Sequence, residues 1–269
     1  MKTILIPTDF SDNARNAIAY AVLLFEREAY NFCFLHAHLI VPSSDNNKEN
    51  LQNRLAGLVQ SFDSKKTNQD HSFEGVLLMK SPFDAIKETL AKRTVDYVFM
   101  GTKGISNLSN IFMGSTTVGV IKNIDSCPIV AVPAGYRFQV PAEIVFANDF
   151  VAPPNKEEME ALIAIAQLWD TTLLIAYVHT EWKLTEGQRL NKELFLDCFS
   201  SVKHRFIEVA MDYSLTSTLL RLEKKNNNIG MVALCNRKHG FFELLMREHV
   251  IRNMVFTTEV PLLVLPSRT

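Results

Sequence analysis

Short apolar runs alternate along the chain with longer segments in which apolar residues recur every three or four positions. The runs at 3–7, 31–39, 73–79, 97–101 and 128–132 have the length and composition of buried strands. The segments between them have the spacing of amphipathic helices. Strands that are apolar throughout and separated by helices predict a parallel sheet with helices on both faces. We therefore expect an α/β fold.

The expected helices of the first half begin at residues that typically cap a helix. Ser11 precedes one apolar-periodic segment, and Ser81 precedes another that has Pro82 at its first helical position. Further helices are expected at about 49–66 and at 115–123.

Two further helices are expected in the second half. Asn155, with Glu158 three residues later, has the pattern of a capping box and predicts a helix start. The apolar spacing then predicts one long helix over about 189–211.

The chain repeats itself, since three apolar motifs return in the same order at a nearly constant spacing. Such collinear matches indicate two similar halves. We expect domains at 1–135 and 142–269, joined by a short linker. The matched pairs are Ile4–Phe10 with Ile144–Phe150, Phe34–His38 with Ile175–His179, and Cys127–Pro133 with Val260–Pro266.

Composition narrows the class of protein. The chain has 269 residues, of which 47% are hydrophobic and 21% charged. These values are typical of a soluble globular protein with enough apolar material for one large or two ordinary domains. The formal net charge of −1 provides no electrostatic footprint for nucleic acid or an anionic membrane, so we expect no partner of either kind.

The cysteines and the N-terminal run bear on the compartment. The four cysteines lie in apolar surroundings without a C-x-x-C pair, which favours reduced core residues. The apolar run at 3–7 is too short for a signal peptide, and no apolar stretch of about 18 residues follows it. We therefore expect a cytoplasmic protein.

Glycine is concentrated in one loop. Four of the 10 glycines lie between residues 101 and 119. Gly101 and Gly104 follow an apolar strand, and Gly114 precedes Ser115 and Thr116 at an expected helix start. Such a loop can point several backbone N–H groups at one place, which suits a phosphate group. A flexible connection between strand and helix is the alternative.

Two other polar positions lie near strand ends. Asp9, like Gly101, follows the carboxyl end of a strand, where ligands bind if the strand order reverses, so the two can share a crevice. His36 and His38 face the same way on a strand, as either a metal pair or satisfied buried histidines. We favour buried histidines, because no third ligand is evident, and we expect no metal site.

Four motifs together resemble the universal stress protein family of the UspA-like type. They are the opening Ile4–Ser11, the strand Phe34–Ala37, the Gly-x2-Gly-x9-Gly-Ser/Thr spacing from Gly101, and the closing Cys127–Pro133. The resemblance covers the first half fully and the second in outline, which implies a tandem two-domain member. It implies two Rossmann-like domains similar to the adenine nucleotide alpha hydrolase group, each a five-stranded parallel sheet in the order 3-2-1-4-5.

The resemblance also implies a nucleotide site in the first half, where the family's glycine motif holds the phosphates and ribose of ATP. Carried over, Asp9 would contact the nucleoside, the backbone of Ala37 would meet adenine, and Met100 would lie against the base. Alternatively, Asp9 only caps the following helix and Met100 belongs only to the core. The implied nucleotide-binding residues are Pro7, Thr8, Asp9, Ala37, Met100, Gly101, Gly104, Gly114, Ser115 and Thr116.

The second half departs from this pattern, although Asp149 matches Asp9. Cys235 falls where the first half has Gly101, and Glu248 falls in the phosphate-binding part of the motif. Side chains would crowd this loop and a carboxylate would repel phosphate, so we expect a degenerate domain. Nearby basic residues form either a solvated face, which we favour, or a site for a smaller anion: Arg237, Lys238, His239, Arg247, His249 and Arg252.

No P-loop, Ser/His/Asp arrangement or carboxylate cluster is present, so no catalytic residue is assigned. The resemblance implies a stress-response or signalling module that binds ATP, with or without Mg²⁺, and hydrolyses it slowly at most. The alternatives are a nucleotide-independent interaction or scaffold protein of the same fold, and a true hydrolase. Protein partners or a homodimer remain open, because strands 129–132 and 262–265 can pair within one molecule or between two.

Overall fold

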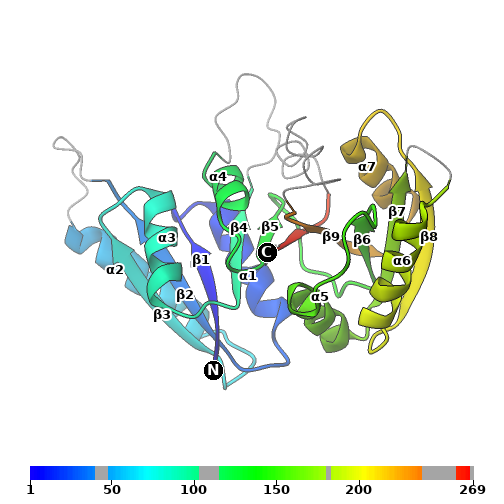
Figure 1. Ribbon diagram of the computed structural model, residues 1–269. Coiled ribbons are helices and arrows are strands. Elements are labelled where there is room, and N and C mark those ends of the chain that lie inside the picture. Colours follow the sequence, from blue (N-terminus) through cyan, green and yellow to red (C-terminus); the bar gives the residue numbers. More distant parts are fainter. Residues whose placement is uncertain (40–47, 103–114, 180–182, 238–258, 267–269) are drawn as a thin grey trace.

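Strands and helices alternate along the chain as expected in the computed structural model, which describes residues 1–39, 48–102, 115–179, 183–237 and 259–266 (Figure 1). The first half contains β1 (Lys2–Pro7), α1 (Asp12–Leu24), β2 (Tyr30–Ala37), α2 (Lys48–Asp63), β3 (Ser72–Leu78), α3 (Pro82–Lys92), β4 (Tyr97–Gly101), α4 (Ser115–Asn123) and β5 (Ile129–Val132). The second half contains β6 (Glu143–Asn148), α5 (Lys156–Trp169), β7 (Thr172–His179), α6 (Glu186–Cys198), β8 (His204–Ala210), α7 (Leu215–Lys225), β9 (Ile229–Cys235) and β10 (Leu262–Leu265).

The strands form one continuous ten-stranded sheet in the order β3-β2-β1-β4-β5-β10-β9-β6-β7-β8. Strands β5 and β10 pair antiparallel, whereas the strands within each half pair in parallel. Each half therefore has the order 3-2-1-4-5. The predicted fold of two tandem Rossmann-like domains is confirmed, and of the two possible pairings of 129–132 with 262–265 the intramolecular one is found.

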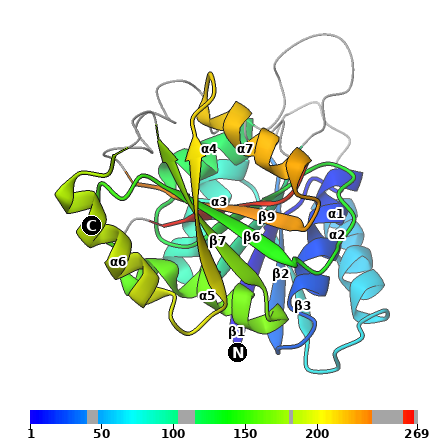
Figure 2. The same cartoon turned by 90° about the vertical axis from the view of Figure 1, so that its right-hand side faces the viewer.

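The sheet is buried on both faces because its strands are apolar on both faces. In β1, Ile4 and Ile6 lie on one side and Leu5 on the other, and all three are 0% exposed. The first side packs against α1, α2, α5 and α6, and the second against α3, α4 and α7. Figure 1 shows α3 and α4 in front of the first-half strands and α1 behind them. Figure 2 looks at the second half, where α6 and α7 lie on opposite sides of β7 and β8.

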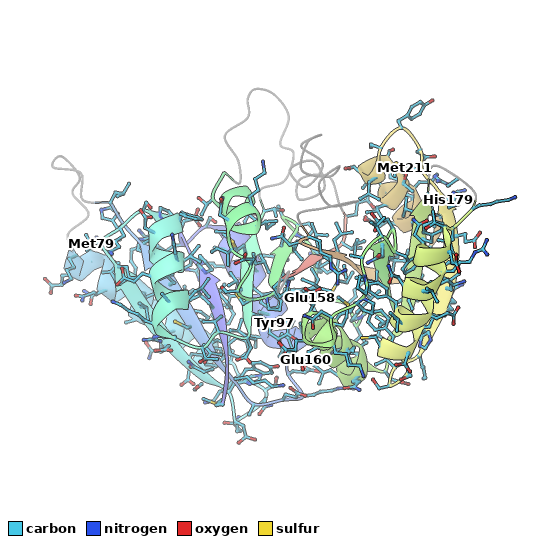
Figure 3. The ribbon with its side chains drawn as sticks, in the orientation of Figure 1. Met79, Tyr97, Glu158, Glu160, His179 and Met211 are labelled. Atoms are coloured by element: carbon cyan, nitrogen blue, oxygen red, sulfur yellow. The ribbon has the colours of Figure 1, made fainter. Side chains whose placement is uncertain are left out.

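Side chains also join the two halves. The Tyr97 hydroxyl of β4 donates to the Ala161 carbonyl of α5 at 3.1 Å. The Trp169 indole N–H donates to the Leu24 carbonyl at the end of α1 at 2.9 Å. Figure 3 shows Tyr97 close to Glu160 of α5 at this junction. The halves therefore meet through helices as well as through the β5–β10 pair.

The three predicted N-caps, Ser11, Ser81 and Asn155, are present. Ser11 accepts a hydrogen bond from the Ala14 N–H, and Ser81 accepts one from the Asp84 N–H. Asn155 caps α5 by accepting from the Glu157 N–H at 3.0 Å. These side chains satisfy backbone donors of the first helical turn that have no partner within the helix.

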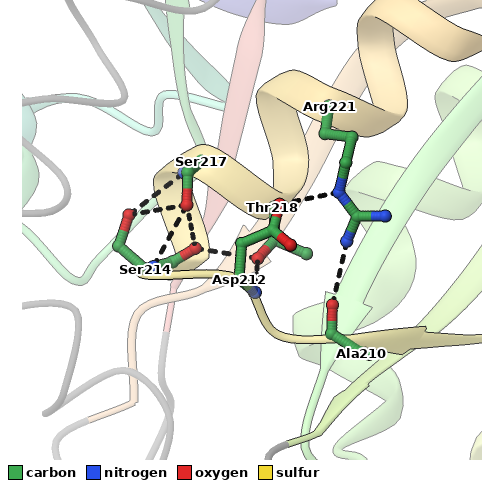
Figure 4. A network of polar contacts seen from close by, with 6 residues as sticks. All are labelled: Ala210, Asp212, Ser214, Ser217, Thr218 and Arg221. Carbon is green, nitrogen blue, oxygen red and sulfur yellow. Dashed lines mark hydrogen bonds and ion pairs between the residues drawn. The ribbon is translucent and has the colours of Figure 1, made fainter.

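The predicted long helix over 189–211 is wrong. Helix α6 ends at Cys198, and residues 204–210 form β8, the edge strand that completes the second half. A separate capping network follows β8 (Figure 4). Ser214 caps α7 through the Ser217 N–H, and the Arg221 guanidinium donates to the Asp212 carboxylate at 2.6 Å. These bonds stabilise the turn between β8 and α7 and the first turn of α7.

Candidate functional site

A cavity of about 260 Å³ lies at the carboxyl ends of β1, β2 and β4. Strand β1 lies between β2 and β4, so the strand order reverses here, as expected for a ligand site in a doubly wound sheet. The cavity is lined by Pro7, Thr8, Asp9, Ser11, Asn13, Ala14, Leu35, Ala37, Pro82, Met100, Gly101, Thr116 and Thr117.

The structure brings seven of the ten predicted site residues together in this cavity. They come from the ends of three strands, the turn after β1 and the first turn of α4: Pro7, Thr8, Asp9, Ala37, Met100, Gly101 and Thr116. Ser115 begins α4, although its side chain is not described. Gly104 and Gly114 lie outside the described residues. The role of these residues in binding stays a prediction.

Asp9 lies in a tight turn built by side-chain hydrogen bonds. The Thr8 hydroxyl accepts from the Phe10 N–H at 3.0 Å, and the Asp9 carboxylate accepts from the Ser11 N–H at 2.9 Å. Phe10 has a φ of 65°, a left-handed conformation that these bonds stabilise. Ser11 is the N-cap of α1, so Asp9 supports the turn without being the cap, and it is exposed at the cavity.

His36 lies beside this turn and is 7% exposed. Its Nδ1 lies 2.7 Å from the Thr8 carbonyl oxygen, and its ring packs 4.4 Å from the Phe10 ring, centroid to centroid. Its Nε2 has no hydrogen-bond partner in the described part of the chain, so the expectation of a fully satisfied histidine is wrong. His38 is half-buried, with its ring 6.4 Å from that of His36.

The packing of α1 against β4 requires a glycine at position 101. A Cβ at this position would lie 2.4 Å from the Asn13 carbonyl oxygen of α1, far inside van der Waals contact. The first turn of α1 therefore approaches the end of β4 directly. Met100 both lines the cavity and is 5% exposed, so it belongs to the core and to the cavity wall together.

Several lining residues were not predicted. Pro82 carried a usable signal, because it follows the third strand of a parallel sheet and therefore had to lie at the same edge as Asp9. Leu35 carried one too, because it lies two residues before Ala37 on the same strand and faces the same way. The others lacked one, since their place depends on how closely α1 and α4 approach the sheet: Ser11, Asn13, Ala14 and Thr117.

The second half repeats the turn. Asn148 accepts from the Phe150 N–H at 2.6 Å, Asp149 accepts from the Val151 N–H at 3.1 Å, and Phe150 has a φ of 56°. Strand β7 places Tyr177 beside this turn, and its ring lies 5.6 Å from the Phe150 ring. The motif is duplicated, but a tyrosine stands where the first half has His36.

The carboxyl end of β9 differs from that of β4. The Arg237 guanidinium contacts the Glu158 carboxylate at 2.7 Å and donates to the Pro153 carbonyl at 2.6 Å. The Glu158 side chain is 4% exposed and the Arg237 side chain 15%, so the carboxylate is buried and the ion pair is largely shielded from solvent. The expectation that Arg237 belongs to a solvated face is wrong. The other five residues of that basic cluster lie outside the described residues.

The cavity wall carries one ionisable side chain, the Asp9 carboxylate, among its described residues. Its other polar groups are hydroxyls, one amide side chain and backbone. In the part of the chain that the structure describes, no group of three or more His, Cys, Asp or Glu side chains could hold a metal ion. Cys33, Cys127 and Cys235 are free and buried, and burial raises the pKa of each thiol to about 12.

Comparison with known proteins identifies a family model and relatives that each match about half of the chain. The family model described as "Universal stress protein family" matches residues 1–133. A universal stress protein of Thermus aquaticus is 29% identical over 136 residues, which cover 49% of this chain and 98% of the relative. One from Methanocaldococcus jannaschii is 30% identical over 139 residues, covering 49% of this chain and 81% of the relative.

Several solved structures resemble the chain over nearly its whole length. The crystal structure of a universal stress protein from Archaeoglobus fulgidus DSM 4304 has a TM-score of 0.75 and 16% sequence identity, covering 98% of each chain. At this identity the likeness shows the fold, including the tandem arrangement, and no more.

Proposed function

The chain belongs to the universal stress protein family, and on that premise we propose that its first half binds an adenine nucleotide, ATP, in the cavity at the carboxyl ends of β1, β2 and β4. In this proposal residues 1–135 form the nucleotide-binding domain of a stress-response or signalling module. Residues 142–269 form a degenerate domain of the same fold.

One observation carries the proposal: residues assigned to the site by sequence motifs far apart in the chain line a single cavity. Asp9 follows β1, Ala37 and Gly101 end β2 and β4, and Thr116 lies on a separate helix, yet all four border the same space. Its volume of about 260 Å³ is slightly below the range of about 300–1,000 Å³ that is typical of ligand pockets. This size suits a nucleoside, with the phosphates extending toward α4.

The start of α4 supports a phosphate position. Helix α4 spans Ser115–Asn123 and has no acidic residue in its first turn. Free N–H groups and the positive end of the helix dipole at such a terminus favour a phosphate group. The hydroxyl of Thr116 and the carboxylate of Asp9 are hard oxygen ligands of the kind that Mg²⁺ takes together with phosphate oxygens. The described wall therefore fits ATP with or without Mg²⁺.

Binding is the role that the cavity supports best. Its described wall contains no His, Cys, Lys or Arg side chain that could act as a base or nucleophile or stabilise developing negative charge. We therefore propose binding with slow hydrolysis at most. None of the helices in the described ranges has the length and apolar character needed to cross a bilayer, and we propose the cytoplasm as the compartment.

Calorimetric titration of the full chain with ATP, with and without Mg²⁺, tests the proposal. We expect one site per chain. Asp9→Ala should weaken binding by about 1–3 kcal/mol, the size of a lost hydrogen bond that leaves its partner unsatisfied. The matched variant Asp149→Ala should bind as the unchanged protein does, because Arg237 and Glu158 occupy the neighbouring position in the second half.

Two results would contradict this assignment. Two equivalent sites per chain would show that the second half is not degenerate. No binding of ATP by a folded chain would leave a nucleotide-independent interaction or scaffold protein as the function. Steady-state measurement of phosphate release separates slow hydrolysis from true hydrolase activity.

A further inference from the structure

His36 connects the cavity wall to the partly buried ring of Phe10. Its ring packs against Phe10, and its Nδ1 contacts the carbonyl oxygen of Thr8, a residue of the cavity wall. Thr8 in turn holds Phe10 in its left-handed conformation through its hydroxyl. The position of the turn that carries Asp9 therefore depends on the hydrogen bond from His36.

The protonation state of this ring follows from its partners. A carbonyl oxygen only accepts hydrogen bonds, so Nδ1 of His36 must carry the proton that is donated to Thr8. In the neutral ring Nε2 is then a bare lone pair, and it is buried without a partner among the described residues. A second proton would have to reside on that buried Nε2 with no acceptor, which is costly.

The charges around His36 also oppose a second proton on balance. Burial lowers the pKa of His36, and His38 and the Arg54 guanidinium of α2 lower it further. The hydrogen bond to Thr8 and the Asp9 carboxylate act in the opposite direction. Arg54 lies over the Phe10 ring, with its guanidinium carbon 4.3 Å from the ring centroid, so a cation lies beside the ring that packs against His36. The neutral imidazole is therefore the form that fits its place.

We propose that His36 is a positioning residue of the nucleotide cavity, which holds the turn in its binding form only while the imidazole is neutral, so that acidification releases the ligand. This inference rests on the proposed function. On protonation, His36 must leave its buried place to solvate Nε2, and Nδ1 then no longer donates to the Thr8 carbonyl. The turn loses its anchor, and Asp9 loses its fixed position at the cavity.

Affinity as a function of pH tests this proposal, with adenosine as the probe beside ATP because adenosine does not titrate between pH 5 and 7.5. We expect constant adenosine affinity near neutral pH and a decline on acidification, approaching about tenfold per pH unit once protonated His36 dominates, as for one proton coupled to release. His36→Asn keeps a side-chain N–H near the position of Nδ1 and cannot titrate. It should bind near neutral pH without the acid-dependent decline.

Two controls separate positioning from a general effect of acid on folding. His38→Asn removes the neighbouring imidazole, which does not contact Thr8, and should keep the decline. His36→Leu removes the donor and should weaken binding at every pH, with circular dichroism confirming that the variants are folded. A flat profile for the unchanged protein, or an unaltered decline in His36→Asn, would overturn the proposal.

A ligand-free measurement keeps this inference distinct from the proposed function. NMR titration of the free protein should show the His36 ring protonating below the usual range for histidine. The Phe10 N–H, which donates to Thr8, should exchange with solvent faster as that titration proceeds. If neither adenosine nor ATP binds at any pH, the proposed function fails. Phe10 exchange that follows the His36 titration would still establish the anchor, whereas exchange independent of it would refute the anchor itself.

Discussion

The two halves of the molecule share a strand order and a turn, but they fill the space beside that turn differently. In the first half only Ser11 separates Phe10 from α1, whose first turn therefore lies against the sheet and lines the cavity. In the second half residues 151–155 intervene between Phe150 and α5. A longer connection moves the helix start, although the preceding turn is the same.

The two halves also differ at the end of their fourth strands, β4 and β9. Gly101 allows the Asn13 carbonyl to approach the end of β4, where a Cβ would clash. Cys235 carries a Cβ at the corresponding place in β9, and the chain then continues to Arg237, which pairs with Glu158. A fold and its first-strand motif are thus duplicated while the residues beside the motif differ, so function has to be argued for each half separately.

Removing Arg237 should give the largest effect. Arg237→Ala removes the guanidinium that pairs with the buried Glu158 carboxylate, and breaking a pair of this kind typically costs about 3–5 kcal/mol of the free energy of unfolding. Urea denaturation measures the loss. Lys203→Ala breaks the ion pair with Asp170, whose two side chains are 61% and 75% exposed, and should cost no more than about 1 kcal/mol.

A double variant sharpens this test. Replacing both charges by apolar side chains, as in Arg237→Met with Glu158→Leu, removes the buried carboxylate together with its cation and should recover most of the lost stability. A loss in Arg237→Ala as small as in Lys203→Ala would show that the pair does not hold the second half together. In that case the proposed degeneracy of the second half needs another cause.

Substitution of Gly101 tests the corresponding contact in the first half, between α1 and the end of β4. Gly101→Ala places a Cβ against the Asn13 carbonyl and should destabilise the protein by about 1–3 kcal/mol, as overpacking does. Cys235→Ala, at the matching position, removes one buried sulfur without a clash and should cost about 1 kcal/mol. Thermal or urea unfolding compares the two. Full stability of Gly101→Ala together with loss of ATP binding would mean that the glycine serves the ligand and not the helix contact.

The fold could be predicted because its signals are local and repeated. The apolar runs, the caps Ser11 and Ser81, and the near-constant spacing of three motifs each depend on neighbouring residues, and all point to the same architecture. The strand order came from the family resemblance, because local pattern does not specify which strands lie side by side.

The missed elements have physical reasons. Strand β8 was predicted as helix because Phe195, Phe199, Val202 and Phe206 keep the spacing of a helix face across the end of α6. Phe206 is in a strand because its segment pairs with β7. The Arg237–Glu158 pair joins residues far apart in the sequence, so no local pattern reveals it.

Substitution of Gly119 should give the smallest change in stability, and it tests which glycines of the region 101–119 serve binding. Gly119 lies within α4, and a Cβ there would meet nothing within 4 Å. Packing therefore does not require this glycine, in contrast to Gly101. Gly119→Ala should stabilise the protein by about 0.4–1 kcal/mol, because alanine loses less backbone entropy in a helix. Unfolding curves measure the gain, and titration with ATP shows whether the cavity is affected. A more stable variant with unchanged affinity would restrict the functional glycines to the loop before α4, whereas weakened binding would show that the close approach of a ligand or partner extends along the helix to Gly119.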